Sequence, residues 1–122
     1  MFIVNPMPEQ IDADLVALLE RVETATIGHF LHSGFVDRDI RAVLPNKRVA
    51  GTAVTLRIPH ADSTLLHYLT AHVRPGDIVV IDRCHDLKHA CWGGVITHCM
   101  KNAGVKAGVI DGPATDFGEI QK

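Results

Sequence analysis

The sequence predicts a single α/β domain built on parallel strands, and three features of its C-terminal half support that prediction. Two short apolar runs rich in β-branched residues, Ile78 to Asp82 and Val105 to Ile110, are typical of buried strands. A helical segment that opens at Gly93-Gly94 lies between them. Strands joined through a helix lie parallel, with a right-handed crossover. The alternation of helices and strands over the rest of the chain agrees with this class.

The segment after Gly93-Gly94 has the periodicity of an amphipathic helix, and Gly104 stands where a helix stop is expected. The apolar residues expected to share its buried face are Val95, Ile96, Cys99, Met100 and Ala103. The strand that follows is ended by the turn signal Asp111-Gly112-Pro113.

Two helices are expected in the N-terminal region. The first follows Pro8, and the second covers Thr26 to His32. The residues expected to face the core are Ile11, Leu15, Leu18, Leu19 and Val22 in the first helix, and Ile27, Phe30 and Leu31 in the second. Residues 35–46 are irregular, and a loop with a short strand is predicted there.

The first strand of the sheet is expected at Val49 to Ile58, where the residue types alternate. Gly51 within it indicates a bulge or the close approach of another backbone segment. Asp62 or Ser63 is expected to cap the next helix. The buried stripe of that helix is predicted to be Leu65, Leu66, Leu69 and Val73.

Composition narrows the class of protein. A chain of 122 residues is long enough for one domain with a core, and its net charge of −2 gives no electrostatic basis for nucleic-acid binding. The apolar runs are too short to span a membrane, and the N-terminus lacks the features of a signal peptide. Three cysteines without secretory features favour a reduced environment. We therefore expect a cytoplasmic protein that binds neither nucleic acid nor membrane.

The predicted topology gathers several polar groups at the carboxyl ends of the strands. Asp82 and Asp111 end two strands, Gly93 to Ile96 start the helix, and Thr115 and Asp116 follow in the last turn. Ligands of open α/β sheets bind at this edge. A glycine-opened helix start offers free N–H groups to a carboxylate or phosphate, and a nearby carboxylate can hold a hard metal ion. The sequence therefore predicts the functional site here.

Several of these residues have a second interpretation. Asp116 is either a metal ligand or the N-cap of a short helix at residues 117–119. Gly93-Gly94 either binds an anion or only permits tight packing, and Trp92 either lines the pocket or fills the core. The cysteines and histidines between residues 84 and 99 do not have zinc-site spacing, so a structural zinc site is not expected.

Three motifs in combination resemble the RraA-like family, which contains regulators of ribonuclease activity and 4-hydroxy-4-methyl-2-oxoglutarate aldolases. The motifs are GDIVVID at 76–82, AxWGGVI at 90–96 and GVKAGVIDGPATD at 104–116. TATIGHFL at 24–31 and VAGTAVTL at 49–56 fall where that family has its N-terminal helix and first core strand. The resemblance covers nearly the whole chain from Thr24 onward.

The resemblance implies a swivelling β/β/α domain that assembles as homotrimers or homohexamers. It also implies a divalent cation, magnesium or manganese, that binds pyruvate-type substrates between subunits. In this sequence Asp116 matches the metal-ligand aspartate, and Thr115 matches the substrate-binding arginine. The positions that match the substrate-binding turn are Gly93, Gly94, Val95 and Ile96.

The sequence departs from the family pattern in three ways. Gly94 replaces an acidic residue that orders water on the metal, and Thr115 offers a hydroxyl where arginine offers a charged pair of donors. Family members also continue well beyond the motif that ends at Asp116, so residues 1–122 are expected to form a single RraA-like domain without the usual C-terminal part.

The predicted activity is that of a class II, metal-dependent aldolase or decarboxylase. It would act on 4-hydroxy-2-oxo acids or oxaloacetate and release pyruvate. Asp82, Asp86 and His85 are the candidates for the base, with Asp82 and Asp116 as the predicted catalytic pair. The alternative is a non-catalytic oligomeric protein of the ribonuclease-regulator type.

Overall fold

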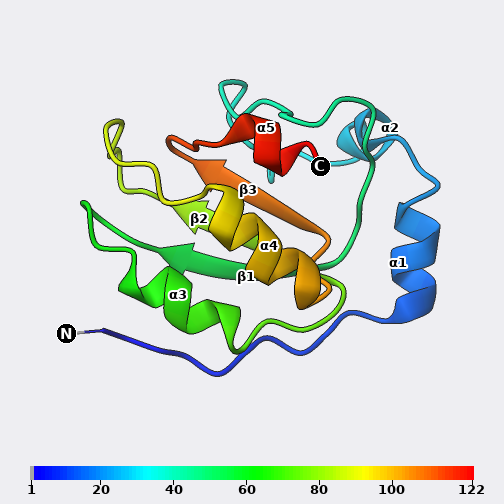
Figure 1. Ribbon diagram of the computed structural model, residues 1–122. Helices are drawn as coiled ribbons and strands as arrows, with labels where there is room; N and C mark the ends of the chain where they lie inside the picture. The colour runs from blue at the N-terminus through cyan, green and yellow to red at the C-terminus, as the bar shows by residue number, and fades with distance from the viewer. Residues whose placement is uncertain (1) are drawn as a thin grey trace.

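A three-stranded parallel sheet forms the centre of the protein (Figure 1). The computed structural model describes residues 2–122. The strands are β1 (Thr52–Arg57), β2 (Asp77–Asp82) and β3 (Ala107–Asp111), in the order β1-β2-β3. The parallel α/β class predicted from the sequence is confirmed, and each strand lies within a few residues of its expected bounds.

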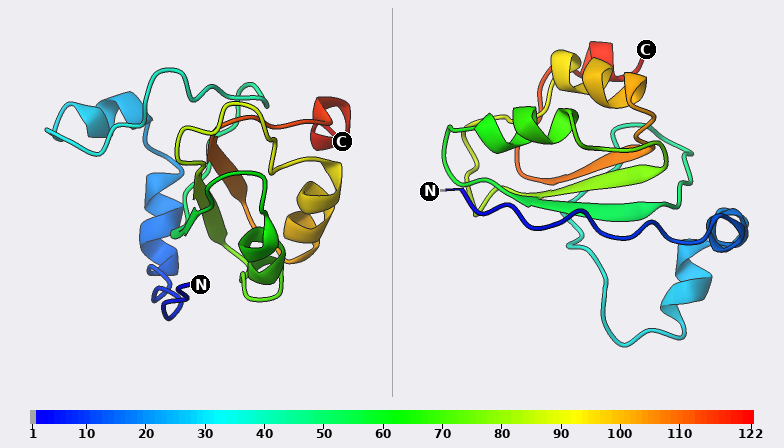
Figure 2. Two further views of the ribbon diagram at one scale, coloured as in Figure 1. Left: turned by 90° about the vertical axis from the view of Figure 1, so that its left-hand side faces the viewer. Right: turned by 90° about the horizontal axis from the view of Figure 1, so that it is seen from below.

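Five helices are present in the described chain, and they are unevenly distributed around the sheet. Helices α3 (Thr64–Thr70) and α4 (Gly94–Asn102) cover one face, with α5 (Phe117–Ile120) beside α4 (Figure 1). Helix α1 (Ala13–Leu19) stands beyond the N-terminal ends of the strands, and α2 (Thr24–Gly28) projects from the body (Figure 2). Figure 2 shows no helix of the described chain packed on the second face of the sheet.

The hydrophobic core lies between the sheet and the helices α3 and α4. Its buried apolar residues are Val54, Ile58, Leu66, Leu69, Val79, Ile81, Cys91, Trp92, Ile96 and Met100. The stripe predicted on α3 is confirmed, because Leu66 and Leu69 are buried while Leu65 and Val73 pack against the core. The Oδ1 atom of Asp62 accepts a hydrogen bond from the Thr64 N–H at 2.8 Å, which starts this helix.

Helix α4 buries only part of the face that was predicted. Ile96 and Met100 are buried as expected, but Val95 is 72% exposed and Cys99 is exposed. The shift has a local cause, because the Thr97 hydroxyl donates to the carbonyl of Gly93 at 2.8 Å and accepts from the Trp92 indole at 3.0 Å. This polar pair turns Thr97 toward the core side and Val95 toward solvent.

The helix stop predicted at Gly104 is confirmed. Gly104 has a φ of +77°, which is favourable for glycine and strained for other residues, and α4 ends just before it.

The expected burial of the two N-terminal helices is wrong. Leu15 and Leu18 on α1 are 46% and 56% exposed, and Phe30 after α2 is 81% exposed. Helix α1 forms where it was predicted because a local signal suffices: the Asp12 side chain accepts from the N–H groups of Asp14 and Leu15. Helix α2 covers Thr24–Gly28 and so starts and ends before the predicted range of Thr26 to His32. Their apolar faces have no second layer to pack against within the described chain.

At Gly51 the sequence predicted a bulge or the close approach of another backbone segment. A Cβ on Gly51 would lie 2.2 Å from the carbonyl oxygen of Gly76, and the next N–H, from Thr52, donates to that same oxygen at 3.3 Å. The predicted close approach of another backbone segment is therefore confirmed. Residues 35–46 form the expected loop, but without the short strand.

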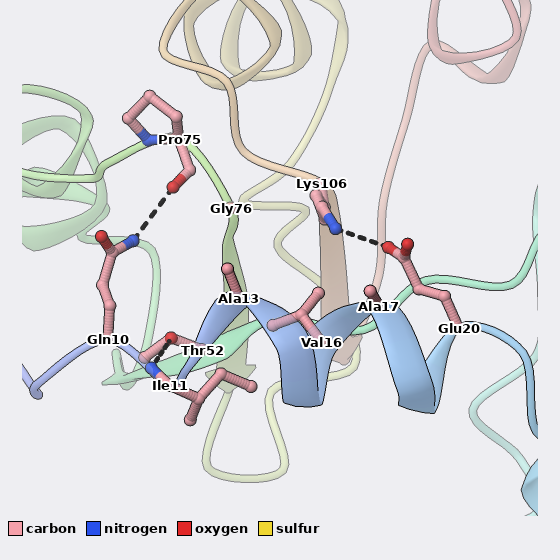
Figure 3. A pocket seen from close by; sticks show the side chains of 10 residues that line it. All are labelled: Gln10, Ile11, Ala13, Val16, Ala17, Glu20, Thr52, Pro75, Gly76 and Lys106. Carbon is pink, nitrogen blue, oxygen red and sulfur yellow. Dashed lines mark hydrogen bonds and ion pairs between the residues drawn. The ribbon is translucent and has the colours of Figure 1, made fainter.

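A buried carboxylate ties the N-terminal segment to the sheet. Asp77 is fully buried and accepts hydrogen bonds from the side chains of Arg74 and Gln10. Gln10 Nε2 also donates to the carbonyl of Pro75 at 2.9 Å (Figure 3). These contacts hold the chain that leads into α1 at the N-terminal edge of the sheet.

Within residues 2–122, none of the helices has the length and apolar character needed to cross a membrane.

Candidate functional site

The start of α4 and the turn after β3 are brought together by an extension of the sheet. Trp92 and Ala114 form an isolated parallel bridge, and the Thr115 N–H donates to the carbonyl of Trp92 at 2.9 Å. This pairing places residues 115–116 beside Gly93. The corner formed by Gly93, Gly94, Thr115 and Asp116 lies at the carboxyl ends of the strands, where ligands of open α/β sheets bind.

Asp116 contacts the first amide of α4. Its Oδ2 atom accepts a hydrogen bond from the Gly94 N–H at 3.0 Å, and its backbone is left-handed, with φ of 58° and ψ of 39°. A carboxylate at this place is favoured by the positive end of the helix dipole. Asp116 is also the residue that precedes α5, but its side chain makes no capping bond there. The expected contact with the helix start is present, and it caps α4 rather than α5.

Gly93 is needed for this contact. A Cβ at Gly93 would lie 2.6 Å from the Asp116 Oδ2 atom and 2.9 Å from the Thr115 Oγ1 atom. Both side chains therefore pack directly on the Gly93 backbone. Thr115 is exposed, so its hydroxyl sits at the surface of the corner.

Glu119 belongs to the same corner, although it was not predicted as a site residue. Its Cβ and Cγ atoms lie 3.2 and 3.4 Å from the point where a Cβ on Gly94 would be. The Glu119 carboxylate pairs with Lys122 Nζ at 2.7 Å. The signal available in the sequence was the spacing Asp116-x-x-Glu119, since residues three apart share one face of a helical turn.

Asp82 does not join this corner. Alternation along β2 sends Ile81 into the core and Asp82 to the opposite face, away from α4. There Asp82 Oδ2 pairs with Arg57 Nε at 3.0 Å, and Oδ1 accepts from the Cys84 N–H at 2.6 Å. Asp111, its register partner on β3, follows the same alternation. Asp82 and Asp111 therefore lie side by side at the carboxyl ends of their strands, as predicted, but on the sheet face opposite the corner of Gly94 and Asp116.

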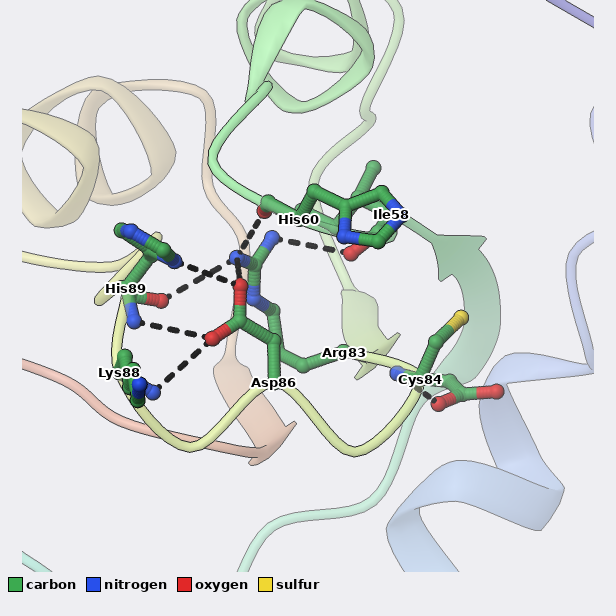
Figure 4. Close-up of polar contacts among 8 residues, drawn as sticks. Ile58, His60, Arg83, Cys84, Asp86, Lys88 and His89 are labelled. Carbon is green, nitrogen blue, oxygen red and sulfur yellow. Dashed lines mark hydrogen bonds and ion pairs between the residues drawn. The ribbon is translucent and has the colours of Figure 1, made fainter.

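The other two candidate bases lie on the loop after β2, which is built around a buried arginine (Figure 4). The Arg83 side chain is 1% exposed and donates to the carbonyls of Ile58 and His89, at 3.0 and 3.2 Å, and to Asp86 at 3.2 Å. These bonds fix residues 84–89 around a hollow of about 430 Å³.

Asp86 is a poor base in this loop. The backbone N–H of Lys88 and the ring of His89 donate to its carboxylate and hold the pKa of Asp86 well below its ordinary value. His85 is exposed and has a left-handed backbone, with φ of 63°. Neither residue hydrogen-bonds to the corner formed by Gly94 and Asp116.

Trp92 fills the core rather than lining a pocket. It is 7% exposed, and its ring carbons lie 2.7 to 3.0 Å from the point where a Cβ on Gly108 would be. Cys91 is buried, which raises the pKa of its thiol, and Cys99 is exposed. Among residues 2–122, no group of three or more His, Cys, Asp or Glu side chains converges as a metal site.

A second hollow lies at the opposite end of the sheet, beside the N-terminal ends of the strands. It has a volume of about 390 Å³ and is lined by Ile11, Val16 and Pro75, with the Lys106–Glu20 ion pair at its side (Figure 3). It opens at the N-terminal ends of the strands, away from the corner that holds Asp116.

Three solved structures share this fold. One is Streptomyces coelicolor RraAS2, described as an unusual member of the RNase ES inhibitor RraA protein family, with 28% identity, a TM-score of 0.75 and coverage of 93% of this chain and 60% of that chain. Another is an uncharacterized protein from Pseudomonas syringae pv. tomato str. DC3000, with 22% identity, a TM-score of 0.76 and coverage of 99% and 57%. The third, described as novel cellulases from microbes associated with the gut ecosystem, has 24% identity, a TM-score of 0.75 and coverage of 90% and 54%.

This chain thus spans between 54% and 60% of the length of those three proteins. The family model RraA-like (Aldolase/RraA) matches residues 13–122, which is nearly the whole chain and includes every residue of the corner described above. The chain belongs to the RraA-like family.

Proposed function

We propose that the corner at the start of α4 is the divalent-cation site of a lyase that acts on small 2-oxo acids. The observation that carries the proposal is that two acidic side chains, Asp116 and Glu119, pack against Gly94. Asp116 bonds to its amide, and the stem of Glu119 occupies the space beside its Cα. Magnesium and manganese prefer oxygen ligands and are commonly bound through one or two carboxylates. The donor set therefore fits such a cation.

Each residue of the corner has a proposed task. Asp116 accepts from the Gly94 amide at Oδ2, and its carboxylate would also hold the cation. Glu119, whose stem packs beside Gly94 and whose carboxylate pairs with Lys122, would stand in for the acidic residue that the family pattern has at position 94. In that place its carboxylate would order water and take the proton of the substrate hydroxyl. The bound cation would polarise the keto group of the substrate.

The substrate carboxylate is proposed to face the first turn of α4. The N–H groups of Val95 and Ile96 belong to that turn, where amides lack intrahelical partners. The helix dipole adds favourable potential for negative charge, including charge that develops on the oxo acid during carbon–carbon cleavage. Thr115 contributes a neutral hydroxyl at the same surface. The proposed substrates are 4-hydroxy-2-oxo acids and oxaloacetate, with pyruvate as product.

Pyruvate release tests the proposal. The chain is incubated with oxaloacetate or a 4-hydroxy-2-oxo acid, with magnesium, with manganese and with a chelator. We expect cation-dependent release, loss of release in Asp116→Asn, and faster release in Thr115→Arg because a guanidinium clamps a carboxylate. Absence of turnover in both the wild type and Thr115→Arg, with either cation, would contradict it.

The second candidate function is a non-catalytic regulatory protein that assembles as a homo-oligomer. Two observations favour it: the uncharged Thr115 at the corner, and the 28% identity to a member of a ribonuclease-inhibitor family over 93% of this chain. Under this proposal the chain binds a ribonuclease and slows RNA cleavage. An RNA-cleavage assay with added chain tests it, and inhibition that persists in Asp116→Asn would separate it from the lyase.

A further inference from the structure

The hollow between α1 and the N-terminal ends of the strands has the size and the walls of a small-ligand site. Its volume of about 390 Å³ lies within the range of about 300–1,000 Å³ that such sites occupy. A polar bridge flanks it on either side: Gln10 Nε2 donates to the Pro75 carbonyl at 2.9 Å, and Lys106 pairs with Glu20 (Figure 3). Because these bridges hold α1 against the strand ends, the hollow exists before a ligand enters.

Small residues on α1 keep the hollow open. Ala13, Val16 and Ala17 lie on the side of the helix that faces the strand ends (Figure 3), whereas Leu15 and Leu18 are 46% and 56% exposed. A helix that packed this side directly on the sheet would carry larger apolar residues there. The hollow therefore has an apolar wall that no side chain of residues 2–122 covers.

The wall on the side of the sheet carries a buried hydroxyl group with an unused hydrogen. Thr52 is 5% exposed, and its Oγ1 atom accepts a hydrogen bond from the Ile11 N–H at 2.9 Å. Within residues 2–122 the Thr52 O–H itself donates to no acceptor. A buried donor without an acceptor costs free energy, so this position favours a ligand that brings an oxygen atom.

The Lys106–Glu20 pair gives the hollow one charge of each sign. The two side chains are 32% and 37% exposed, so each can bond a ligand as well as its partner. The hydrogen bond from Lys106 lowers the pKa of the Glu20 carboxyl and keeps it ionised at neutral pH. Lys106 is fixed at the strand ends, where its N–H donates to the Asp77 carbonyl at 2.9 Å. Donors thus come from the sheet, and the acceptor comes from α1.

We propose that this hollow binds a small zwitterion, an α-amino acid with an apolar side chain. The carboxylate of the ligand faces the strand ends, where Thr52 and Lys106 offer donors. Its ammonium group faces Glu20, and its side chain lies against the alanines of α1.

Other small ligands satisfy fewer of these groups. A neutral apolar molecule leaves the Thr52 donor unpaired. A monocarboxylate adds a second negative charge beside Glu20, and an amine adds a second positive charge beside Lys106. The proposal does not rest on the lyase chemistry, because the hollow shares no residue with the corner of Gly94 and Asp116.

Isothermal titration calorimetry with L-leucine, L-valine and L-methionine tests the proposal. We expect at least one of them to bind with a dissociation constant below about 1 mM. Three fragments of leucine each lack one recognised group: glycine lacks the side chain, 4-methylpentanoate the ammonium group and 3-methylbutylamine the carboxylate. We expect each fragment to bind at least about tenfold more weakly than the amino acid.

Variants assign the binding to the hollow. Ala17→Leu fills it with a residue that favours helices, and Glu20→Gln and Lys106→Met each remove one charge. We expect each to weaken binding at least about tenfold. The matched controls are Ala25→Leu, at an exposed alanine of α2, and Glu23→Gln, which breaks the ion pair with Arg48 outside the hollow.

Thermal unfolding by circular dichroism shows that each variant is folded, and Asp116→Asn should bind the amino acid as wild type does even if the lyase proposal fails. Failure of all three amino acids to bind wild type below about 1 mM would overturn the proposal. Binding of glycine as tight as that of the best amino acid, or undiminished binding to folded Ala17→Leu, would do the same.

Discussion

The Asp116 carboxylate lies 3.0 Å from the backbone nitrogen of Gly94, a residue 22 positions earlier in the chain. A helix usually receives its cap from the residue that precedes it, but here that residue is Gly93, which has no side chain to offer. The cap is supplied instead from the turn after β3. The Asp116 carboxylate thus joins the turn after β3 to the start of α4, while the Asp116 backbone carbonyl accepts the first bonds of α5.

Replacement of Asp116 should separate its structural and chemical roles. Asp116→Ala removes the cap and leaves a non-glycine, non-Asx residue at a φ of 58°, so we expect the free energy of unfolding to fall by about 2 kcal/mol. Asp116→Asn keeps an acceptor and tolerates this backbone, so its loss should stay below about 1 kcal/mol. Urea unfolding of both variants measures the difference. Equal losses in the two variants would contradict the capping role.

Gly93 should tolerate no side chain. Gly93→Ala places a Cβ 2.6 Å from the Asp116 Oδ2 atom, so the carboxylate must leave the Gly94 amide at a cost of about 1–3 kcal/mol. Gly118→Ala is the control, because a Cβ there meets open space and alanine favours the helix. Thermal unfolding should show a lower midpoint for the first variant and an equal or higher one for the second. A Gly93→Ala chain as stable as wild type would show that the corner is loosely packed.

The contact between Trp92 and Gly108 should be visible in fluorescence. Gly108→Ala places a Cβ 2.7 Å from a carbon of the indole ring, so the ring must move outward and stability should fall by about 1–3 kcal/mol. Trp92 is the only tryptophan, so the emission spectrum reports on this ring alone. We expect a red shift in the folded variant. An unshifted spectrum with unchanged stability would contradict the tight packing described above.

Asp86 should contribute to acid sensitivity. Its pKa is lowered in the folded protein from an ordinary value of 3.8, because the Lys88 N–H and the His89 ring bond the ionised form. A group with a lowered folded pKa stabilises the protein above its unfolded pKa and loses that contribution as the pH falls below it. The stability difference between wild type and Asp86→Asn should therefore shrink as the pH drops below 3.8. A difference that is constant through this range would remove Asp86 from the account.

Local signals predicted the elements of the fold well. The strands, the helix α4 and the stop at Gly104 follow from apolar periodicity and from glycine positions, both of which depend on short stretches of sequence. The direction in which helices face was less predictable. The inward turn of Thr97 depends on its bonds to Trp92 and to Gly93, and no periodicity records a side-chain hydrogen bond.

Only part of the candidate site was predicted, because the direction in which a side chain points does not follow from local sequence signals. Placing Asp116 at the start of α4 required only the parallel crossover, which the sequence indicates. Placing Asp82 there ignored the alternation along β2, which sends it to the face opposite Ile81. Glu119 went unnoticed because its importance depends on the absence of a side chain at Gly94, a relationship that appears only when α5 is seen against α4.

Manganese binding followed by electron paramagnetic resonance tests the proposed cation site most directly. We compare wild type with Asp116→Asn, Glu119→Gln and Asp14→Asn, the last an exposed carboxylate on α1 that serves as control. We expect one bound ion per chain in wild type and in Asp14→Asn, and affinity weaker by about tenfold or more in the other two variants. Equal affinity in all four chains, or none in wild type, would contradict the assignment of Asp116 and Glu119 to a metal centre.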